Sequence, residues 1–403
     1  MNTLFWSKII NKALNKYPTP FHLYSQKPII HYMKELHNTI GIGVENWLSM
    51  KTLPIKPVLK LWQTLGYGIE VTSEYELIAA QRIGFSPNKI IVNGVAKHSW
   101  KESCWTEQLR VNFDSLNEVK LMSQKAKSMN WLVGFRFHSD YQFDPENPEV
   151  PDQFGLSLKE FIEAYSLLSK SDIKLNSLHL HLRSNIPSVS FLKSSIEELF
   201  ALCLKLGIEV KQLDLGGGLP ANNVKQNDKC WQSSYTLNDL SVIVKFCRDK
   251  FNSLDNIILE NGRFVLSNSG VLVLSINDIK YTNGQKHVIC DGGRTNHALP
   301  SDWEKHEIMI MPPRVGDSVS TRICGPTCMA FDCIDIIPLS VNIQIGDKLI
   351  YFDTGAYSLQ WENRFSHPLA RVLWHDSNDK IYEIRNKEGF NSWYANLGDL
   401  CVD

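Results

Sequence analysis

Eight short apolar segments, each followed by polar or glycine residues and then by a stretch of helical character, constrain the fold of this chain more than any other feature. The spacers at 77–83 and 191–206 repeat apolar residues at helical intervals. Strands that alternate with helices form parallel sheets, and eight such units close into a (β/α)8 barrel. We therefore predict an α/β chain built on a TIM barrel. The segments cover residues 46–51, 68–73, 89–94, 109–114, 131–136, 177–181, 212–216 and 256–260.

After about residue 264 the pattern changes to strand-like segments separated by glycine-containing turns. Residues 270–276 and 348–352 are typical of strands, and residues 20–24 are also strand-like although they precede the barrel segments. A chain of 403 residues is long for one hydrophobic core. We predict two domains, a barrel over residues 30–264 and a β-rich sandwich or barrel formed by residues 1–29 and 265–403.

Charge and cysteine content exclude several classes of function. The formal net charge of −1 favours neither nucleic acid nor an anionic membrane as a partner. The nine cysteines include no CxxC pair, which argues against a disulfide framework and a zinc site and favours a reducing compartment. Residues 1–6 do not form a secretory signal, and no apolar run approaches the roughly 18 residues of a membrane-spanning helix. We expect a cytoplasmic protein without a metal site.

Polar and ionisable residues stand where the predicted barrel strands end. In barrels of this kind the chemistry takes place at the carboxyl ends of the strands, so these side chains are expected to surround one site. The strand ends carry Lys51, Ser73, Asn93, Arg136, His181, Gly216 and Glu260.

Lys51 and the three consecutive glycines Gly216, Gly217 and Gly218 are candidates for holding a cofactor. A partly buried lysine can attack an aldehyde, whereas an exposed one is simply a surface cation. Backbone N–H groups of a glycine loop can line a phosphate, although a tight turn with positive φ would need the same residues. The dinucleotide fingerprint GxGxxG is absent, which disfavours a nucleotide-binding fold.

Four further motifs allow more than one interpretation. His179 and His181 alternate along a strand and could form part of a metal site, pack on a flat ring or lie in the core, and no third metal ligand suggests itself. Glu260 could lie beneath a pyridine nitrogen or pair with Arg263. Near the C-terminus, Cys328 could be a small buried hydrophobe, and the segment 355–357 could be a simple turn.

Taken together and in this order, the motifs resemble the fold-type III pyridoxal 5′-phosphate (PLP) decarboxylases, which include ornithine, arginine and diaminopimelate decarboxylases. The resemblance runs from about residue 19 to residue 357. Each motif is weak alone, and their succession is specific. The motifs are Lys51, the segment 71–77, the segment 181–184, the triple glycine, and the segments 260–263, 325–328 and 355–357.

The resemblance implies a barrel of the alanine-racemase type, PLP as cofactor, and a head-to-tail homodimer with shared active sites. It implies that Lys51 forms the Schiff base with PLP, that His181 stacks on the pyridine ring and that Glu260 partners its nitrogen. Cys328 would enter from the partner subunit and help to protonate the product. Glu70 and Glu76 resemble carboxylates near the lysine, and Arg136 resembles their salt-bridge partner. The implied phosphate cradle consists of Ser184, Gly216, Gly217, Gly218, Gly262, Arg263 and Tyr357.

Several residues depart from the family pattern at positions that face the substrate. Met329 stands where the family has an acidic residue, Leu299 replaces an arginine, Trp303 replaces a tyrosine and Arg183 replaces a glycine. Loss of a buried ion-pair partner would cost a charged substrate group roughly 3–5 kcal/mol. With Asp332 nearby in sequence, these residues predict a remodelled pocket for a side-chain-capped diamino acid, such as the citryl conjugates of siderophore biosynthesis.

Three alternatives remain open at this point. The substrate could be free ornithine, lysine or diaminopimelate, in which case Arg183 would pair with a surface carboxylate and face solvent. The chain could also be a catalytically inactive regulatory relative, which retention of Lys51, Glu260 and Cys328 disfavours. A racemase is disfavoured by Glu260, because racemases of this fold have arginine opposite the pyridine nitrogen.

Overall fold

The computed structural model describes residues 3–41, 43–142, 151–221, 225–226, 233–297 and 300–398. The chain divides into two compact units. One unit consists of Tyr32–Asn222 and Asp228–Phe264, and is called the barrel unit below. The other, the sheet unit, consists of Met1–His31, Asn223–Asn227 and Val265–Asp403.

The barrel unit contains a closed ring of eight parallel strands. Each of the eight predicted segments forms one of these strands, so the prediction of a (β/α)8 barrel is confirmed. The ring closes where β10 pairs with β2. In order, the strands are β2 (Val44–Ser49), β3 (Gly68–Val71), β4 (Ile90–Val92), β5 (Arg110–Phe113), β6 (Leu132–Arg136), β7 (Leu175–His179), β8 (Gln212–Asp214) and β10 (Asn256–Asn261).

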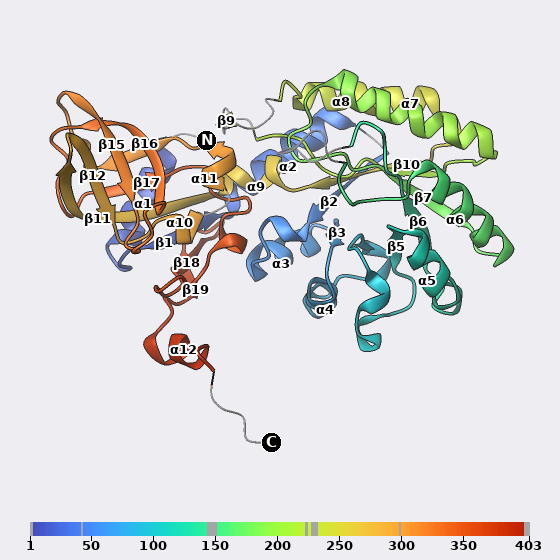
Figure 1. The fold of residues 1–403 in the computed structure, drawn as a ribbon, viewed down its shortest axis with the longest axis horizontal. Helices are drawn as coiled ribbons and strands as arrows, with labels where there is room; N and C mark the ends of the chain where they lie inside the picture. Colours follow the sequence, from blue (N-terminus) through green and yellow to red (C-terminus); the bar gives the residue numbers. More distant parts are fainter. Residues whose placement is uncertain are drawn as a thin grey trace. The chain divides into compact units, whose positions relative to one another are not determined.

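Helices lie between most successive strands of this barrel, and Figure 1 shows them around the outside of the strands. Helix α2 precedes the first strand, and between β4 and β5 the chain forms only short 3-10 turns. Five of the helices, α4 to α8, begin at a serine or threonine whose side chain accepts a hydrogen bond from the backbone amide three residues later. The helical periodicity at 77–83 and 191–206 lies within α4 and α7, as predicted. The helices are α2 (Gln26–Ile40), α3 (Lys56–Thr64), α4 (Glu74–Ile83), α5 (Leu116–Ser128), α6 (Leu158–Lys170), α7 (Val189–Leu206) and α8 (Leu237–Lys250).

A nine-stranded mixed sheet forms the sheet unit. Its main path runs in the order β16-β15-β12-β11-β1-β18-β19, while β17 pairs with β11 and β14 pairs with β17. These strands are β1 (Phe21–Ser25), β11 (Gly270–Thr282), β12 (Gln285–Cys290), β14 (Ile308–Met311), β15 (Ser318–Cys324), β16 (Cys333–Ser340), β17 (Lys348–Tyr351), β18 (Arg371–His375) and β19 (Ile381–Arg385).

Strand β1 explains why the N-terminal segment belongs with the C-terminal half of the chain. It pairs with β11 on one side and with β18 on the other, so residues 20–24 complete the sheet as the sequence suggested. The predicted strands at 270–276 and 348–352 correspond to β11 and β17. Together with the barrel, the separate sheet confirms the predicted fold class.

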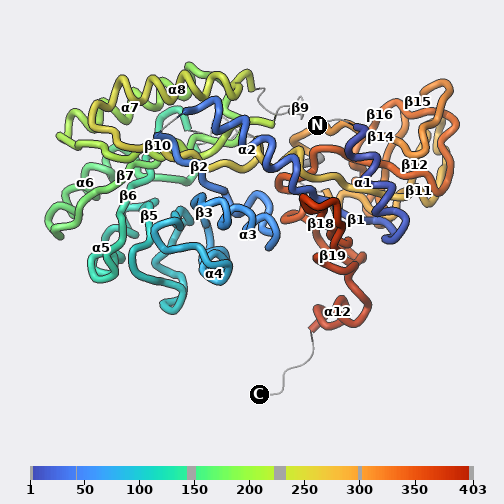
Figure 2. Tube along the Cα trace, turned by 180° about the vertical axis from the view of Figure 1, so that it is seen from behind, coloured from blue at the N-terminus to red at the C-terminus, as the bar shows by residue number. Residues whose placement is uncertain are grey.

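Alternation along β11 divides the core of the sheet unit into two clusters. Val271 and Val273 pack in one cluster with the buried side of helix α1 (Thr3–Leu14), which Figure 2 shows next to β1. Leu272 and Leu274 pack in the other, with residues of β12, β15 and β17. The sequence analysis did not predict α1, whose apolar residues Trp6, Ile9 and Ile10 cover this face.

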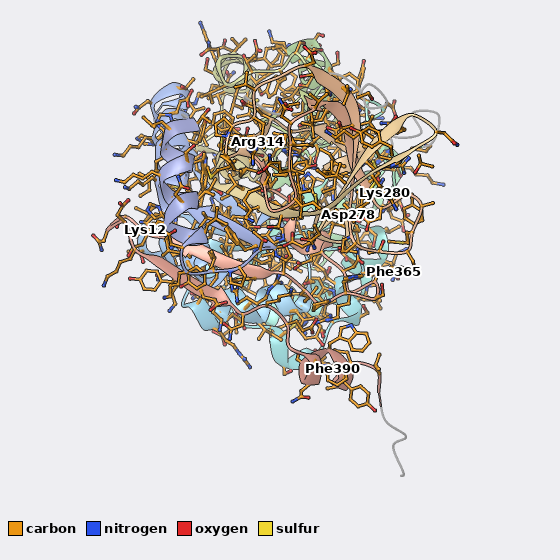
Figure 3. All side chains as sticks on the ribbon, turned by 90° about the vertical axis from the view of Figure 1, so that its left-hand side faces the viewer. Lys12, Asp278, Lys280, Arg314, Phe365 and Phe390 are labelled. Carbon is orange, nitrogen blue, oxygen red and sulfur yellow. The ribbon has the colours of Figure 1, made fainter. Side chains whose placement is uncertain are left out.

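Short elements complete both units. The exposed end of β11 carries Asp278 and Lys280, which are labelled in Figure 3. Among the described residues, no helix has the length and apolar character needed to cross a membrane. The remaining short elements used below are the 3-10 turn η1 (Met50–Thr52) and the helices α9 (Arg263–Leu266), α10 (Arg294–His297), α11 (Pro300–Trp303) and α12 (Phe390–Ala395).

Phe21→Ala is expected to lower the free energy of unfolding by about 3–5 kcal/mol, because it removes a fully buried ring from the cluster that joins α1 to the sheet. Tyr281→Ala is the control, since Tyr281 is 61% exposed on β11 and its truncation should change stability by less than about 0.5 kcal/mol. Urea unfolding followed by circular dichroism measures both. Equal effects of the two variants would contradict this description of the core.

Candidate active site

Lys51 lies in η1, directly after strand β2, where its amine meets a buried carboxylate. Its Nζ is 2.7 Å from Glu70 Oε2, and Ser49 Oγ donates to the same oxygen at 2.6 Å. Glu70 is only 1% exposed, whereas the Lys51 side chain is 41% exposed. The amine is thus held by an ion pair on one side and remains accessible on the other. Access to the amine is one requirement for attack on an aldehyde, and the paired ammonium group must also lose a proton before it can attack.

His181 lies beside the triple-glycine loop that follows β8. The Gly217 N–H donates to His181 Nδ1 at 3.0 Å. Burial, and then the nearby charges of Arg136 and Lys51, hold the pKa of His181 well below its usual value. A neutral imidazole can accept at Nδ1, so the hydrogen bond and the lowered pKa agree.

Glycine is required in this loop because neighbouring groups approach the backbone closely. A Cβ at Gly216 would lie 2.5 Å from His181 Nδ1, and one at Gly218 would lie 2.5 Å from the Arg183 carbonyl oxygen. Both glycines have positive φ, +61° and +105°. At Gly262, after β10, a Cβ would come within 2.4 Å of Thr52 Oγ1. The loops at these strand ends therefore have no room for side chains, as in loops that bind phosphate through backbone amides.

Arg136, at the end of β6, connects His181 to a second acidic group. Its Nη2 donates to the His181 carbonyl oxygen at 3.4 Å, and its Nη1 lies 3.7 Å from Asp114 Oδ1. The guanidinium also lies over the Phe154 ring, 4.5 Å from its centroid. Arg136 thus forms an ion pair with Asp114, which was not predicted from the sequence, where Glu70 and Glu76 had been expected. Glu76 instead accepts from Thr72 N at 2.8 Å.

Glu260 projects from β10 into a hydrogen-bonded chain of side chains. It accepts from Asn93 Nδ2, and Asn93 Oδ1 accepts in turn from Asn112 Nδ2 at 2.8 Å. Asn112 Oδ1 accepts from Ser177 Oγ at 3.3 Å. Four strands, β10, β4, β5 and β7, thereby fix the orientation of one buried carboxyl group. Of the residues that support Glu260 in this way, only Asn93 was predicted from the sequence to lie at the end of a barrel strand.

His179 and Asp214 also face Glu260, and sequence reasoning did not bring these three together. His179 Nε2 lies 3.8 Å from Glu260 Oε2, and the three groups have a set of atoms within 4.8 Å of one another. Burial raises the pKa of Asp214 to about 7, and burial together with Asp214 and Glu70 raises that of Glu260 well above its usual value. His181 is not part of this cluster. The signal that could have found Asp214 is its position at the end of β8, two residues before the first of the glycines.

Arg183 is largely buried, with 8% of its surface exposed. Its Nε donates to the Ser184 carbonyl oxygen at 3.1 Å. The alternative in which Arg183 faces solvent is therefore wrong, because most of the residue is buried. Ser184 is exposed, and Arg263 is 7% exposed at the start of α9.

The remaining predicted residues belong to the sheet unit. Cys328 is exposed in the loop between β15 and β16, and Met329 and Trp303 are partly buried. Asp332 is 2% exposed and accepts hydrogen bonds from Arg294 N at 2.8 Å and Thr327 N at 3.0 Å. Its carboxylate accepts from backbone amides of its own loop and of α10, and a direct contact with substrate stays a prediction.

Two predicted site residues remain, Tyr357 and Leu299. Tyr357 has a positive φ of 61°, which fixes the sharp turn after Gly355. Leu299 lies outside the described residues.

Comparison with models of protein families identifies the family of this chain. Residues 27–267, more than half of the chain, match the model of the pyridoxal-dependent decarboxylases, pyridoxal binding domain. The chain belongs to the pyridoxal-dependent decarboxylase family. It is a PLP-dependent carboxy-lyase, as the resemblance implied.

Relatives of this decarboxylase cover nearly its whole length. It is 26% identical to diaminopimelate decarboxylase of Aquifex aeolicus over 95% of this chain and 92% of the relative. It is 24% identical to that of Haemophilus influenzae, over 96% and 95%.

Solved structures show the same fold. Diaminopimelate decarboxylase of Helicobacter pylori complexed with L-lysine has a TM-score of 0.81 at 23% identity, covering 96% of this chain and 99% of the other. Lysine/ornithine decarboxylase of Vibrio vulnificus complexed with cadaverine has a TM-score of 0.76 at 17% identity, covering 91% and 97%.

The residues at the strand ends of this decarboxylase fit PLP. An accessible amine, a glycine loop in which side chains would clash, a neutral imidazole and a buried carboxyl group match the aldehyde, phosphate, ring face and ring nitrogen of the cofactor. All four belong to the barrel unit.

Gly216→Ala is expected to weaken PLP binding at least about tenfold, since the added methyl group would displace the His181 ring. Gly207→Ala is a matched control. Gly207 has nearly the same positive φ, +65°, but nothing lies within 4 Å of its Cβ position. Both variants should lose about 1–2 kcal/mol of stability from backbone strain, and only Gly216→Ala should lose cofactor affinity in a fluorescence titration. Equal affinities would contradict the close packing of the loop on His181.

Proposed function

We propose that residues 30–264 form the PLP-binding domain of this decarboxylase and that its substrate is a free diamino acid of the diaminopimelate, lysine and ornithine class. The observation that carries the choice of substrate is that the relatives described above, matched over almost their whole length, are diaminopimelate decarboxylases. The reaction is removal of the α-carboxylate.

In this proposal the barrel residues hold the cofactor and control protons around it. When bound, PLP supplies an electron sink for the electron pair left on the α-carbon as CO₂ departs. Lys51 provides the amine that binds the cofactor covalently, and Glu70 keeps that amine in place by the ion pair at 2.7 Å. His181 packs on the ring face, and Arg136 holds its backbone carbonyl. Glu260 faces the ring nitrogen.

The proposed phosphate site consists of backbone amides and polar side chains at the strand ends. Loops of this type bind phosphate through backbone N–H groups. The Gly216 and Gly217 N–H groups donate to Asp214 Oδ1 and His181 Nδ1, so contact of either one with the phosphate requires that hydrogen bond to be exchanged when PLP binds. Arg263, at the first position of α9, adds a cation. The full proposed set is Ser184, Gly216, Gly217, Gly218, Gly262, Arg263 and Tyr357.

We propose a head-to-tail homodimer in which Cys328 of one subunit serves the site of the other. Its thiol is exposed, as a residue that reaches a partner's site must be. Its role is to deliver a proton to the product carbon. The backbone hydrogen bonds of Asp332 hold the loop that carries Cys328 and Met329. Seven described cysteines, Cys328 among them, have free thiols, which supports a reducing cytoplasmic location.

A second candidate is a side-chain-capped diamino acid, such as a citryl conjugate of siderophore biosynthesis. The buried Arg183 favours it, because an additional cation inside the barrel unit would suit a substrate that carries extra carboxylates. Met329, in place of an acidic residue, would likewise suit a capped amine. Trp303, Leu299 and Asp332 are proposed as further substrate-side residues.

Lys51→Ala is expected to abolish covalent attachment of PLP and to reduce kcat/KM about a thousandfold or more. Lys60→Ala is the control, since Lys60 is an exposed lysine on α3. Borohydride reduction followed by peptide mass spectrometry should label the Lys51 peptide in wild type and in Lys60→Ala only. A labelled peptide elsewhere would overturn the assignment of Lys51, and no labelling of wild type would favour an inactive relative.

The substrate proposal predicts that free diaminopimelate, lysine or ornithine is decarboxylated with a kcat/KM at least about tenfold above that of citryl-capped diamino acids. Met329→Glu should improve a free diamine further, because it restores a carboxylate for the distal ammonium. Met329→Gln is the matched uncharged control. The test measures CO₂ release from each compound. If a capped compound has the higher kcat/KM, the capped diamino acid is the substrate and the free diamino acid is not.

Mixing Lys51→Ala with Cys328→Ser protein tests the shared site. In randomly mixed dimers about half the molecules are hybrids with one intact site, so activity should recover to about one quarter of wild type. Each variant mixed with itself is the control. No recovery after verified subunit exchange would show that Cys328 acts within its own subunit or not at all.

A further inference from the structure

Three neighbouring strands place an acidic pair and an imidazole together inside the barrel unit. His179 on β7 and Asp214 on β8 are direct cross-strand partners, and Glu260 comes from β10, the next strand in the ring. All three are buried, with exposed fractions of 1%, 0% and 4%. Atoms of all three lie within 4.8 Å of one another.

Two carboxyl groups at this separation cannot both be ionised without a large electrostatic penalty. A positively charged His179 would reduce this repulsion between the carboxylates. Burial and nearby cations keep the pKa of His179 well below its usual value, so its ring is neutral. Ser177, Asn112 and Asn93 are uncharged. The other titratable groups that act on the cluster are Glu70, Lys51, Arg110, Arg136, His181 and Lys97.

Asp214 also connects Glu260 to the glycine loop. Gly216 N–H donates to Asp214 Oδ1 at 2.9 Å, and the Glu260 N–H donates to the Gly216 carbonyl oxygen at 2.8 Å. A change at Asp214 therefore reaches Glu260 through the backbone as well as through charge.

We propose that Asp214 is a positioning residue that acts through Glu260: in the cofactor-free protein the two carboxyl groups share one proton, and Glu260 gives up this proton to the ring nitrogen when PLP binds. The proton moves from a carboxyl oxygen to the nitrogen, so the total charge of the site is unchanged. Asp214 thus makes Glu260 a proton donor before the cofactor arrives. This inference rests on the proposed role of Glu260 at the ring nitrogen.

The sharing is tested on cofactor-free protein by urea unfolding between about pH 5 and 8. The folded pKa values of the pair lie above the usual carboxyl values, so the stability that the shared proton provides is present at low pH and lost as pH rises through about 7. One such proton changes the unfolding constant by up to about tenfold per pH unit. Asp214→Asn, Glu260→Gln and the double variant should each flatten this dependence, and the double variant should flatten it by less than the sum.

Asp291→Asn provides the control for additivity. Asp291 is a partly buried carboxyl group of the sheet unit whose pKa is also raised, by burial, and it accepts from Thr19 and from Ser275 N. Combined with Asp214→Asn, its effect should add fully, because the two groups share no proton. A wild-type pH dependence in Asp214→Asn, or full additivity of Asp214→Asn and Glu260→Gln, would overturn the proposal.

Infrared spectroscopy provides a second test that does not require Asp214→Asn to fold. Cofactor-free wild type at about pH 6.5 should show the carbonyl band of a protonated carboxyl group, which Glu260→Gln should lose and PLP should remove. A band that persists after PLP binding would contradict the transfer to the ring nitrogen, and absence of the band would contradict the sharing. Borohydride labelling of Lys51 reports separately on the proposed function, so failure of one does not imply failure of the other.

Discussion

Closure of the parallel barrel between β10 and β2 is the constraint on which the rest of the site depends. The register places Glu260 opposite Trp47 and Asn261 opposite Leu48, so the carboxyl ends of the first and last strands meet. Lys51 follows three residues after Leu48, in η1. Because all eight strands run the same way, the carboxyl ends of all of them lie on one side of the ring. Without closure, the lysine and the acidic group of β10 would stand at opposite edges of an open sheet.

The site combines an accessible cation with a buried acidic interior. Lys51 is paired with Glu70 at the strand ends, while Glu260 and Asp214 lie among uncharged amides and a neutral imidazole. Buried carboxyl groups of this kind are tolerated because they can hold a proton. The ring nitrogen of PLP can accept such a proton. This relationship between interior charge and cofactor chemistry links the fold of the decarboxylase to its proposed mechanism.

Much of the fold was predictable because the patterns are local. Each barrel strand is a short apolar segment followed by a polar residue, and several helices begin with a serine or threonine cap. Helix α1 was missed because its apolar side is recognisable only once the sheet beneath it is known. The sequence did not decide whether the Arg183 side chain is buried or faces solvent, because burial of a single arginine depends on neighbours distant in sequence. The structure shows that it is buried. Lys51, His181, the glycines and Glu260 were predicted as site residues from residue type and order.

The sequence by itself determined the strand order, the residues at the strand ends and the family to which their succession points. These follow from periodicity and from residue types that the chain carries regardless of its environment. Only the tertiary structure decided which strand-end residues meet. His179, Asp214 and Glu260 are separated by 35 and 46 residues along the chain, by subtraction of their numbers, and become neighbours because β7, β8 and β10 are consecutive in the ring. The raised pKa values of the two carboxyl groups exist only after that meeting, because burial and mutual repulsion are properties of the folded barrel.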